Sequence, residues 1–126
     1  MLDHYRTRLT RIPFGVAVLA SLLILFMPAS GVPTAPPGTD KVVHFALFAA
    51  LAATGRIAGF PTSRLLPGLV GYAITSEILQ GLLPIGRSCE VADGLVDVAG
   101  AAAGWAIIAA ARRVRRVRRI SDASSR

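Results

Sequence analysis

The sequence predicts an all-α protein, an integral membrane four-helix bundle with both termini in the cytoplasm. Three observations point to this fold class. Of the 126 residues, 53% are hydrophobic and only 17% are charged, whereas soluble domains carry about 25% charged residues. Four apolar stretches follow one another, each long enough to cross a hydrocarbon core about 30 Å thick as a helix. The basic residues gather in the segments that would face the cytoplasm.

The whole chain, residues 1–126, is predicted to form one membrane domain. The four spans cover residues 12–28, 42–58, 65–83 and 94–111, and residues 112–126 form a basic cytoplasmic tail. Each span is predicted as an α-helix, because a helix satisfies all backbone polar groups within its own segment and lipid offers no other partner.

The first span ends where residues 28–38 contribute four of the eight prolines. Proline lacks a backbone donor and clashes with the preceding helical turn, so this segment cannot continue the helix. A basic start and small residues after the span also fit a cleaved signal peptide. Cleavage would leave an odd number of spans against the charge distribution of the loops, so a retained helix is favoured.

The later spans are separated by shorter breaks. Gly59-Phe-Pro61 ends the second span, and Pro84-Ile-Gly86 ends the third. Proline and glycine are the strongest local signals for turns. The fourth span leads without such a break into the arginine-rich tail.

Basic residues are distributed unevenly over the loops. Twelve of the fourteen Lys and Arg residues fall in the two terminal segments or between the second and third spans, and the exceptions are Lys41 and Arg87. Cytoplasmic loops of membrane proteins carry such an excess. An even number of spans then places both termini inside, so we predict a multi-pass protein of the bacterial plasma membrane.

The tail is predicted to bind anionic lipids, because each arginine close to a membrane surface contributes about 1 kcal/mol. Val114, Val117 and Ile120 recur at three-residue spacing, so a continuing helix would keep a narrow apolar edge. Nucleic acid is not a predicted partner, since no aromatic stacking platform or recognised module accompanies the arginines.

Polar residues converge on the outer ends of the last three spans. The predicted binding residues are Asp40, Lys41, His44, Glu77, Gln80, Arg87, Asp93 and Asp97. Ionisable groups inside a membrane are expensive and by default functional. We therefore expect a site in this layer, with Glu77 and His44 as the candidate catalytic residues if the protein is an enzyme.

Helical spacing places some of these residues on common faces. Asp40 and His44 are four residues apart and share a face. Asp93, Asp97, Gly100 and Gly104 form one stripe, in which residues 100–104 read G-x-x-x-G and permit close approach of another helix. We expect this stripe to face the bundle and to direct Asp97 inward.

Structural interpretations remain open for several of these residues. Asp40 and Asp93 precede helices and would suit N-cap positions. His44 and Gln80 would also suit hydrogen bonds inside a bundle. Lys41 and Arg87 would also suit interface positions from which their side chains extend towards water.

Glu77 lies too deep to stay charged without a partner. Arg87, a few residues beyond the helix end, is the best donor, so we predict an ion pair between the two. The single cysteine, Cys89, excludes an intrachain disulfide. His44, Glu77 and the two aspartates have ligand types that suit a metal, but their spacing does not predict one, so no metal or cofactor is predicted.

Three short motifs occur in order along the chain. They are D-K-x-x-H at residues 40–44, E-x-x-Q at residues 77–80, and R-S followed by D-x-x-x-D-x-x-G at residues 87–100. In combination they resemble the VanZ-like family over roughly residues 40–104. The resemblance implies a small bacterial membrane protein with about four helices, in a family named for a protein linked to teicoplanin resistance. Many members carry Asn in place of Asp97, so the resemblance assigns that position no role.

Three function classes follow. The favoured one is an envelope protein that binds a cell-wall precursor, a lipid or a glycopeptide antibiotic at the outer face. The first alternative is a membrane-embedded enzyme acting on an envelope lipid or peptidoglycan precursor, with Arg87 holding an anionic group. The second is a small carrier that uses Glu77 and Asp97. The spacing of these residues does not identify a nucleophile with a base and an orienting group, so the enzyme is not favoured. The sequence shows no internal repeat of the kind typical of carriers, so the carrier is not favoured either.

Overall fold

The computed structural model describes the backbone of residues 2–125 and the side chains of residues 8–125. The chain forms α1 (Leu2–Leu25), a short 3-10 turn η1 (Ala29–Gly31), α2 (Thr39–Ile57), α3 (Thr62–Leu82) and α4 (Val91–Ser124). The described residues contain no strand, so the predicted all-α class is confirmed.

Some helices begin or end at other residues than the predicted spans. The helix α1 begins at Leu2 rather than at residue 12 and stops at Leu25 rather than at Pro28. Pro28 disfavours the helical conformation at Met27, the residue before it. The helix α4 does not stop at the predicted tail and continues through the arginines to Ser124.

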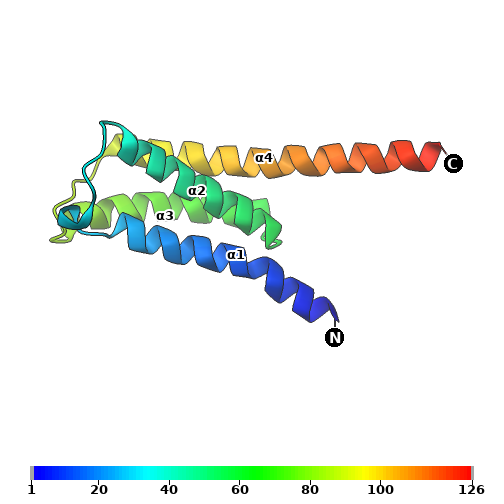
Figure 1. The fold of residues 1–126 in the computed structure, drawn as a ribbon, viewed down its shortest axis with the longest axis horizontal. Coiled ribbons are helices and arrows are strands. Elements are labelled where there is room, and N and C mark those ends of the chain that lie inside the picture. Colours follow the sequence, from blue (N-terminus) through cyan, green and yellow to red (C-terminus); the bar gives the residue numbers. More distant parts are fainter. Residues whose placement is uncertain (1, 126) are drawn as a thin grey trace.

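The four helices run side by side along one long axis (Figure 1). The α1–α2 and α3–α4 connections lie together at one end, which we term the loop end. The start of α1 and the α2–α3 turn lie at the other, the terminal end, beyond which α4 projects. The central helix is α2, which packs against the other three and most extensively against α4.

The contact between α2 and α4 is made possible by glycine. Gly100 and Gly104 are buried, and a Cβ at either position would overlap the backbone carbonyl of Phe45 or Ala49 in α2. The prediction that this stripe is a packing face is confirmed. It brings the first half of α4 against the first half of α2, and with it Asp97 against His44.

The hydrophobic core is thin and lies along α2. Phe48, Leu51 and Ala52 form its centre, together with residues of α3 such as Leu69. Many large apolar side chains point outward instead, including Leu23, Leu95 and Ile107, which are 62%, 67% and 65% exposed. An exposed apolar surface of this extent is typical of a membrane-facing or protein-binding surface.

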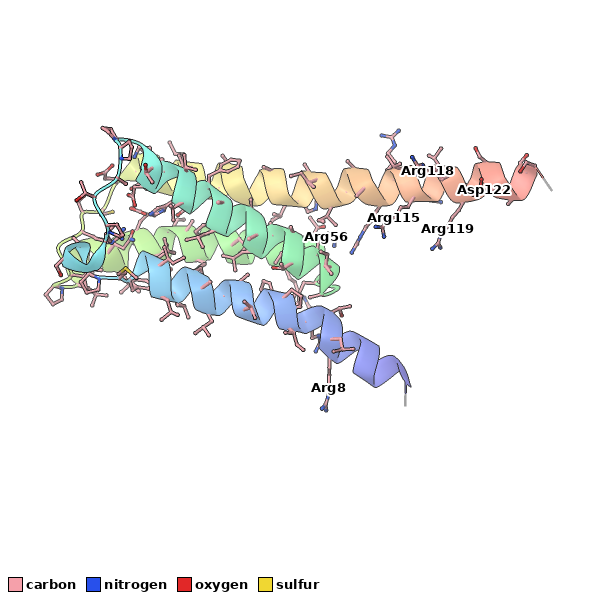
Figure 2. The ribbon with its side chains drawn as sticks, in the orientation of Figure 1. Arg8, Arg56, Arg115, Arg118, Arg119 and Asp122 are labelled. Carbon is pink, nitrogen blue, oxygen red and sulfur yellow. The ribbon has the colours of Figure 1, made fainter. Side chains whose placement is uncertain are left out.

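Two helices are long and apolar enough to cross a membrane by length and composition. They are α1, over Arg8–Leu25, and α4. Arg8, Arg56, Arg115, Arg118 and Arg119 lie towards the terminal end (Figure 2). The number of spans and their orientation in a bilayer remain predictions from the sequence.

We expect reporter fusions after Arg56 and after Arg126 to report the cytoplasm, and a fusion after Pro36 to report the outside. The physical reason is the retention of the basic terminal end on the cytoplasmic side. Paired alkaline phosphatase and fluorescent protein fusions measure this, since each is active on one side only. A cytoplasmic signal at Pro36 would contradict the four-span topology.

Candidate functional site

Three buried polar side chains meet inside the loop end, each from a different helix. His44 comes from α2, Glu77 from α3 and Asp97 from α4, and we term them the buried triad. Nδ1 of His44 lies 2.9 Å from Oδ1 of Asp97 and 3.8 Å from Oε1 of Glu77. The three residues are only 1%, 5% and 0% exposed. The fold therefore joins residues that are between 20 and 53 positions apart in the sequence.

Each member of the triad is positioned by a local feature. Asp97 lies one turn before Gly100, so the close approach of α2 and α4 brings His44 within hydrogen-bond distance of it. Glu77 is held from the other side, because its Oε2 accepts a 3.0 Å hydrogen bond from the backbone N–H of Glu90. Its Oε1 is thereby directed towards His44.

The triad carries unsatisfied acceptors. Oε1 of Glu77 and Oδ2 of Asp97 are buried and have no hydrogen-bond partner among the described residues. Buried polar groups in folded proteins are nearly always hydrogen-bonded, and each exception needs an explanation. Two carboxylates here share a single histidine.

A second layer of charge lies next to the triad. Nζ of Lys41 is 2.5 Å from Oδ1 of Asp93 and 3.3 Å from Oε2 of Glu90. The hydrogen bond from Lys41 to Asp93 raises the pKa of the Lys41 ammonium above its ordinary value. Lys41 thus joins the start of α2 to the start of α4. Glu90 was not among the predicted binding residues, although an acidic residue four positions before the predicted fourth span was a usable signal.

Arg87 contacts Asp40 and not Glu77. Its Nη1 lies 3.5 Å from Oδ1 of Asp40, and its Nε donates a 3.0 Å hydrogen bond to the carbonyl of Met27. The predicted ion pair between Glu77 and Arg87 is therefore wrong. The turn after α3, with Gly86 at φ 71°, directs Arg87 towards the end of α1 instead of back along α3.

The N-cap interpretation is also wrong. Gly38 occupies the N-cap of α2 and Glu90 that of α4. Asp40 and Asp93 lie inside the first turns of these helices, where a negative charge interacts favourably with the helix dipole. Both aspartates are available for the side-chain pairs described above.

Gln80 has a structural contact. It is 2% exposed, and its Nε2 donates a 2.7 Å hydrogen bond to the carbonyl of Leu25 at the end of α1. A second polar contact, 3.0 Å between the hydroxyls of Ser21 and Tyr72, also links α1 with α3. The hydrogen-bonded bundle role proposed for Gln80 from the sequence thus matches its position.

A cavity of about 740 Å³ lies at the loop end beside the triad. Its apolar wall comes from the end of α1 and the proline-rich connection, and includes Ile24, Leu25, Met27, Val32, Pro33 and Pro36. Its polar lining consists of Thr39 and the ionisable residues Asp40, His44 and Arg87. Cys89 is an exposed free thiol and is not among the lining residues.

A family model described as VanZ/LLP1 matches residues 5–112. The chain belongs to the VanZ/LLP1 family. The match includes the first span and the start of the arginine run, which the three motifs did not cover. The chain matches no curated protein and no solved structure. Family membership and the two apolar helices indicate a membrane protein.

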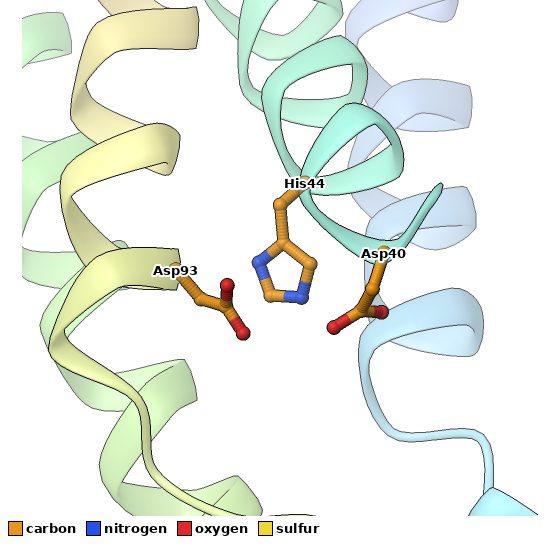
Figure 3. A group of neighbouring side chains, drawn as sticks. All are labelled: Asp40, His44 and Asp93. Atoms are coloured by element: carbon orange, nitrogen blue, oxygen red, sulfur yellow. The ribbon is translucent and has the colours of Figure 1, made fainter. Parts of the chain in front are cut away.

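In this VanZ-like protein the three sequence motifs meet in space. The first motif supplies His44, the second Glu77 and the third Asp97. The His44 ring lies between the carboxylates of Asp40 and Asp93, with Nε2 on the side of Asp40 (Figure 3). One nitrogen of the ring therefore contacts the triad while the other faces the charged layer at the cavity.

Proposed function

We propose that this VanZ-like protein is a multi-pass protein of the cell membrane that binds a lipid-linked cell-wall precursor at its outer face. The observation that supports the proposal is the cavity of about 740 Å³ at the loop end. Its size falls in the range of small-molecule sites, about 300–1,000 Å³. It also combines an apolar wall with a few charged groups, as an amphipathic ligand requires.

The apolar wall suits the hydrocarbon part of such a ligand. Ile24, Leu25 and Met27 line the cavity where α1 ends, and prolines of the connection extend the same wall. These residues lie where a bilayer would meet its headgroup layer if the loop end faces outward. An isoprenoid or acyl segment would therefore enter the cavity from the membrane.

The polar lining suits a phosphate. The Arg87 side chain is 15% exposed and contacts Asp40 at 3.5 Å, while Asp40 itself is 57% exposed. This long contact to an exposed carboxylate is readily exchanged for a ligand. The planar guanidinium of Arg87 would then bind phosphate oxygens through two parallel hydrogen bonds.

We expect Arg87→Gln to weaken the binding of a fluorescent polyprenyl phosphate at least ~10-fold, because a hydrogen bond to a charged group contributes about 1.5–3 kcal/mol. The measurement is a fluorescence titration of the full chain in nanodiscs. Arg11→Gln is the matched control, since Arg11 is exposed on α1. A polyprenol without phosphate should bind weakly to both variants.

Two results would contradict the precursor proposal. One is equal affinity of the Arg87→Gln variant and the unchanged protein for polyprenyl phosphate. The other is binding of a teicoplanin-type glycopeptide in the absence of polyprenyl phosphate binding, which would make the antibiotic the ligand.

An enzymatic role is the second candidate, and the contact between His44 and Asp97 favours it. With the proton on Nδ1, His44 donates a hydrogen bond to the buried Asp97 carboxylate, which orients the ring as a carboxylate orients a catalytic histidine. Nε2 would then act as a general base at the cavity. Mass spectrometry of the precursor in the same nanodisc samples tests this role. The protein would be an enzyme if it converts the precursor and the His44→Gln variant binds the precursor without converting it.

The arginine-rich end of α4 is proposed to bind anionic lipids. The helix continues through it to Ser124, and Val114, Val117 and Ile120 are 52%, 57% and 62% exposed. An apolar edge among arginines suits the surface of an anionic membrane. Figure 2 places Arg115, Arg118 and Arg119 on this projecting segment.

A further inference from the structure

We propose that the buried triad of His44, Glu77 and Asp97 binds one divalent transition metal ion of the zinc class. The proposal does not depend on the ligand of the cavity and stands whether or not a precursor binds there. Four observations support it.

The first observation is geometric. One ligand atom from each residue of the triad lies within 4.8 Å of the others. Tetrahedral zinc with bonds of about 2.0–2.1 Å separates its ligand atoms by about 3.3 Å. The measured separations from Nδ1 of His44, 2.9 and 3.8 Å, lie on either side of that value.

The second observation is the charge of the triad. With both carboxylates ionised and the imidazole neutral, as metal ligands require, the triad would carry a formal charge of −2 in a region that is almost fully buried. Lys41 is paired with Asp93 and Glu90, and Arg87 with Asp40. Among the described side chains, His44 is the only basic group within salt-bridge distance of either carboxylate. A divalent cation would neutralise the cluster.

The third observation is the pair of unpartnered acceptors. Oε1 of Glu77 and Oδ2 of Asp97 are buried and lack a hydrogen-bond partner in the described part of the chain. The opposite oxygen of each carboxylate is satisfied, by the backbone of Glu90 and by His44. A cation bound to Nδ1 of His44 and to both carboxylates would replace the hydrogen bond from His44, because a nitrogen that coordinates a metal has no proton to donate, and it would satisfy Oε1 of Glu77 and the oxygens of Asp97.

The fourth observation is the surrounding shell. A histidine that binds a metal through one nitrogen commonly donates from its other nitrogen to a carboxylate. Nε2 of His44 lies on the side of the Asp40 carboxylate (Figure 3). The hydrogen bond from the Glu90 backbone to Oε2 orients Glu77 in the same way.

The residue types favour zinc or a similar ion over magnesium. Imidazole suits zinc and other first-row metals, whereas magnesium prefers six oxygen ligands and retains water. Three protein ligands are also the number found in zinc sites that keep a fourth position for water or substrate. The neighbouring group of Asp40, His44 and Asp93 has similar spacing, but its carboxylates are already paired with Arg87 and Lys41.

The test uses the full chain in detergent, without a tag and freed of metal by EDTA. Isothermal titration with Zn²⁺ should give about one equivalent of tightly bound metal. His44→Gln and Asp97→Asn should each weaken zinc binding more than ~10-fold. Changing a residue that only supports a metal ligand already weakens binding by about 10-fold or more, and these variants change the ligands themselves. The matched controls His4→Gln and Cys89→Ser remove the only other histidine and the only thiol, and both should keep full affinity.

A second measurement decides the question if the triad variants do not fold. The His4→Gln/Cys89→Ser double variant is loaded with Co²⁺, whose visible absorption reports four-coordinate binding by nitrogen and oxygen. Intense visible bands and a Zn²⁺-dependent rise in unfolding temperature are the expected results. Substoichiometric zinc in the unchanged protein, or loss of binding in this double variant, would overturn the proposal.

Discussion

Leucine at Gly104 is expected to prevent the helices from assembling into the native bundle. A Cβ at this position would overlap the carbonyl of Ala49 on α2, and a backbone atom cannot rotate out of the way. Overpacking in a core that can adjust costs about 1–3 kcal/mol. The cost here is larger, because the collision separates α2 from α4, the most extensive contact in the bundle. Gly100→Leu should act similarly through Phe45.

The yield of monodisperse protein in detergent and its unfolding temperature measure this effect. Gly71→Leu on α3 is the matched control, since Gly71 is helical and a Cβ there would meet no atom within 4 Å. Gly38 is a poor control, because its φ of 86° would strain any side chain. If Gly104→Leu and Gly71→Leu were equally stable, the close contact of α2 with α4 would be incorrect.

Removal of the His44 imidazole is expected to destabilise the fold by about 3–5 kcal/mol, the usual cost of leaving a buried charge without its partner. In the His44→Ala variant, Glu77 and Asp97 would remain buried with no basic side chain within 4 Å among the described residues. The free energy of unfolding in detergent measures the effect. EDTA in the buffer keeps metal loss from contributing.

A second substitution separates the effect of charge from that of the space left by the imidazole. Asp97→Asn removes one carboxylate charge at nearly constant volume, so His44→Ala/Asp97→Asn should be more stable than His44→Ala alone. A cavity effect would not be relieved in this way. Equal stability of the two variants would show that the triad is not held together by charge.

Helix content was predictable from local information. Apolar stretches of helical length, together with the prolines and glycines between them, placed all four helices within a few residues at most ends. The largest difference is at α4, which continues to Ser124. The glycine stripe was also predictable, because residues at i, i+4, i+7 and i+11 share a helix face whatever that face contacts.

Side-chain pairing was only partly predictable. The polar layer was recognised from the depth of its residues in the spans, and His44, Glu77 and Asp97 do meet. The partner of Glu77 was predicted incorrectly, because proximity in sequence favoured Arg87. That arginine contacts Asp40 in the structure, a residue 47 positions away.

The sequence by itself determined the helices, the face of α4 that packs, and the residues whose burial would need an explanation. Composition and periodicity are local properties, and each can be read within one segment. The tertiary structure alone decided which polar atoms pair and which acceptors of Glu77 and Asp97 remain unpartnered. Those outcomes depend on the rotation of each helix about its axis and on the path of the loops. Both are set by packing between segments that spacing along the chain does not encode.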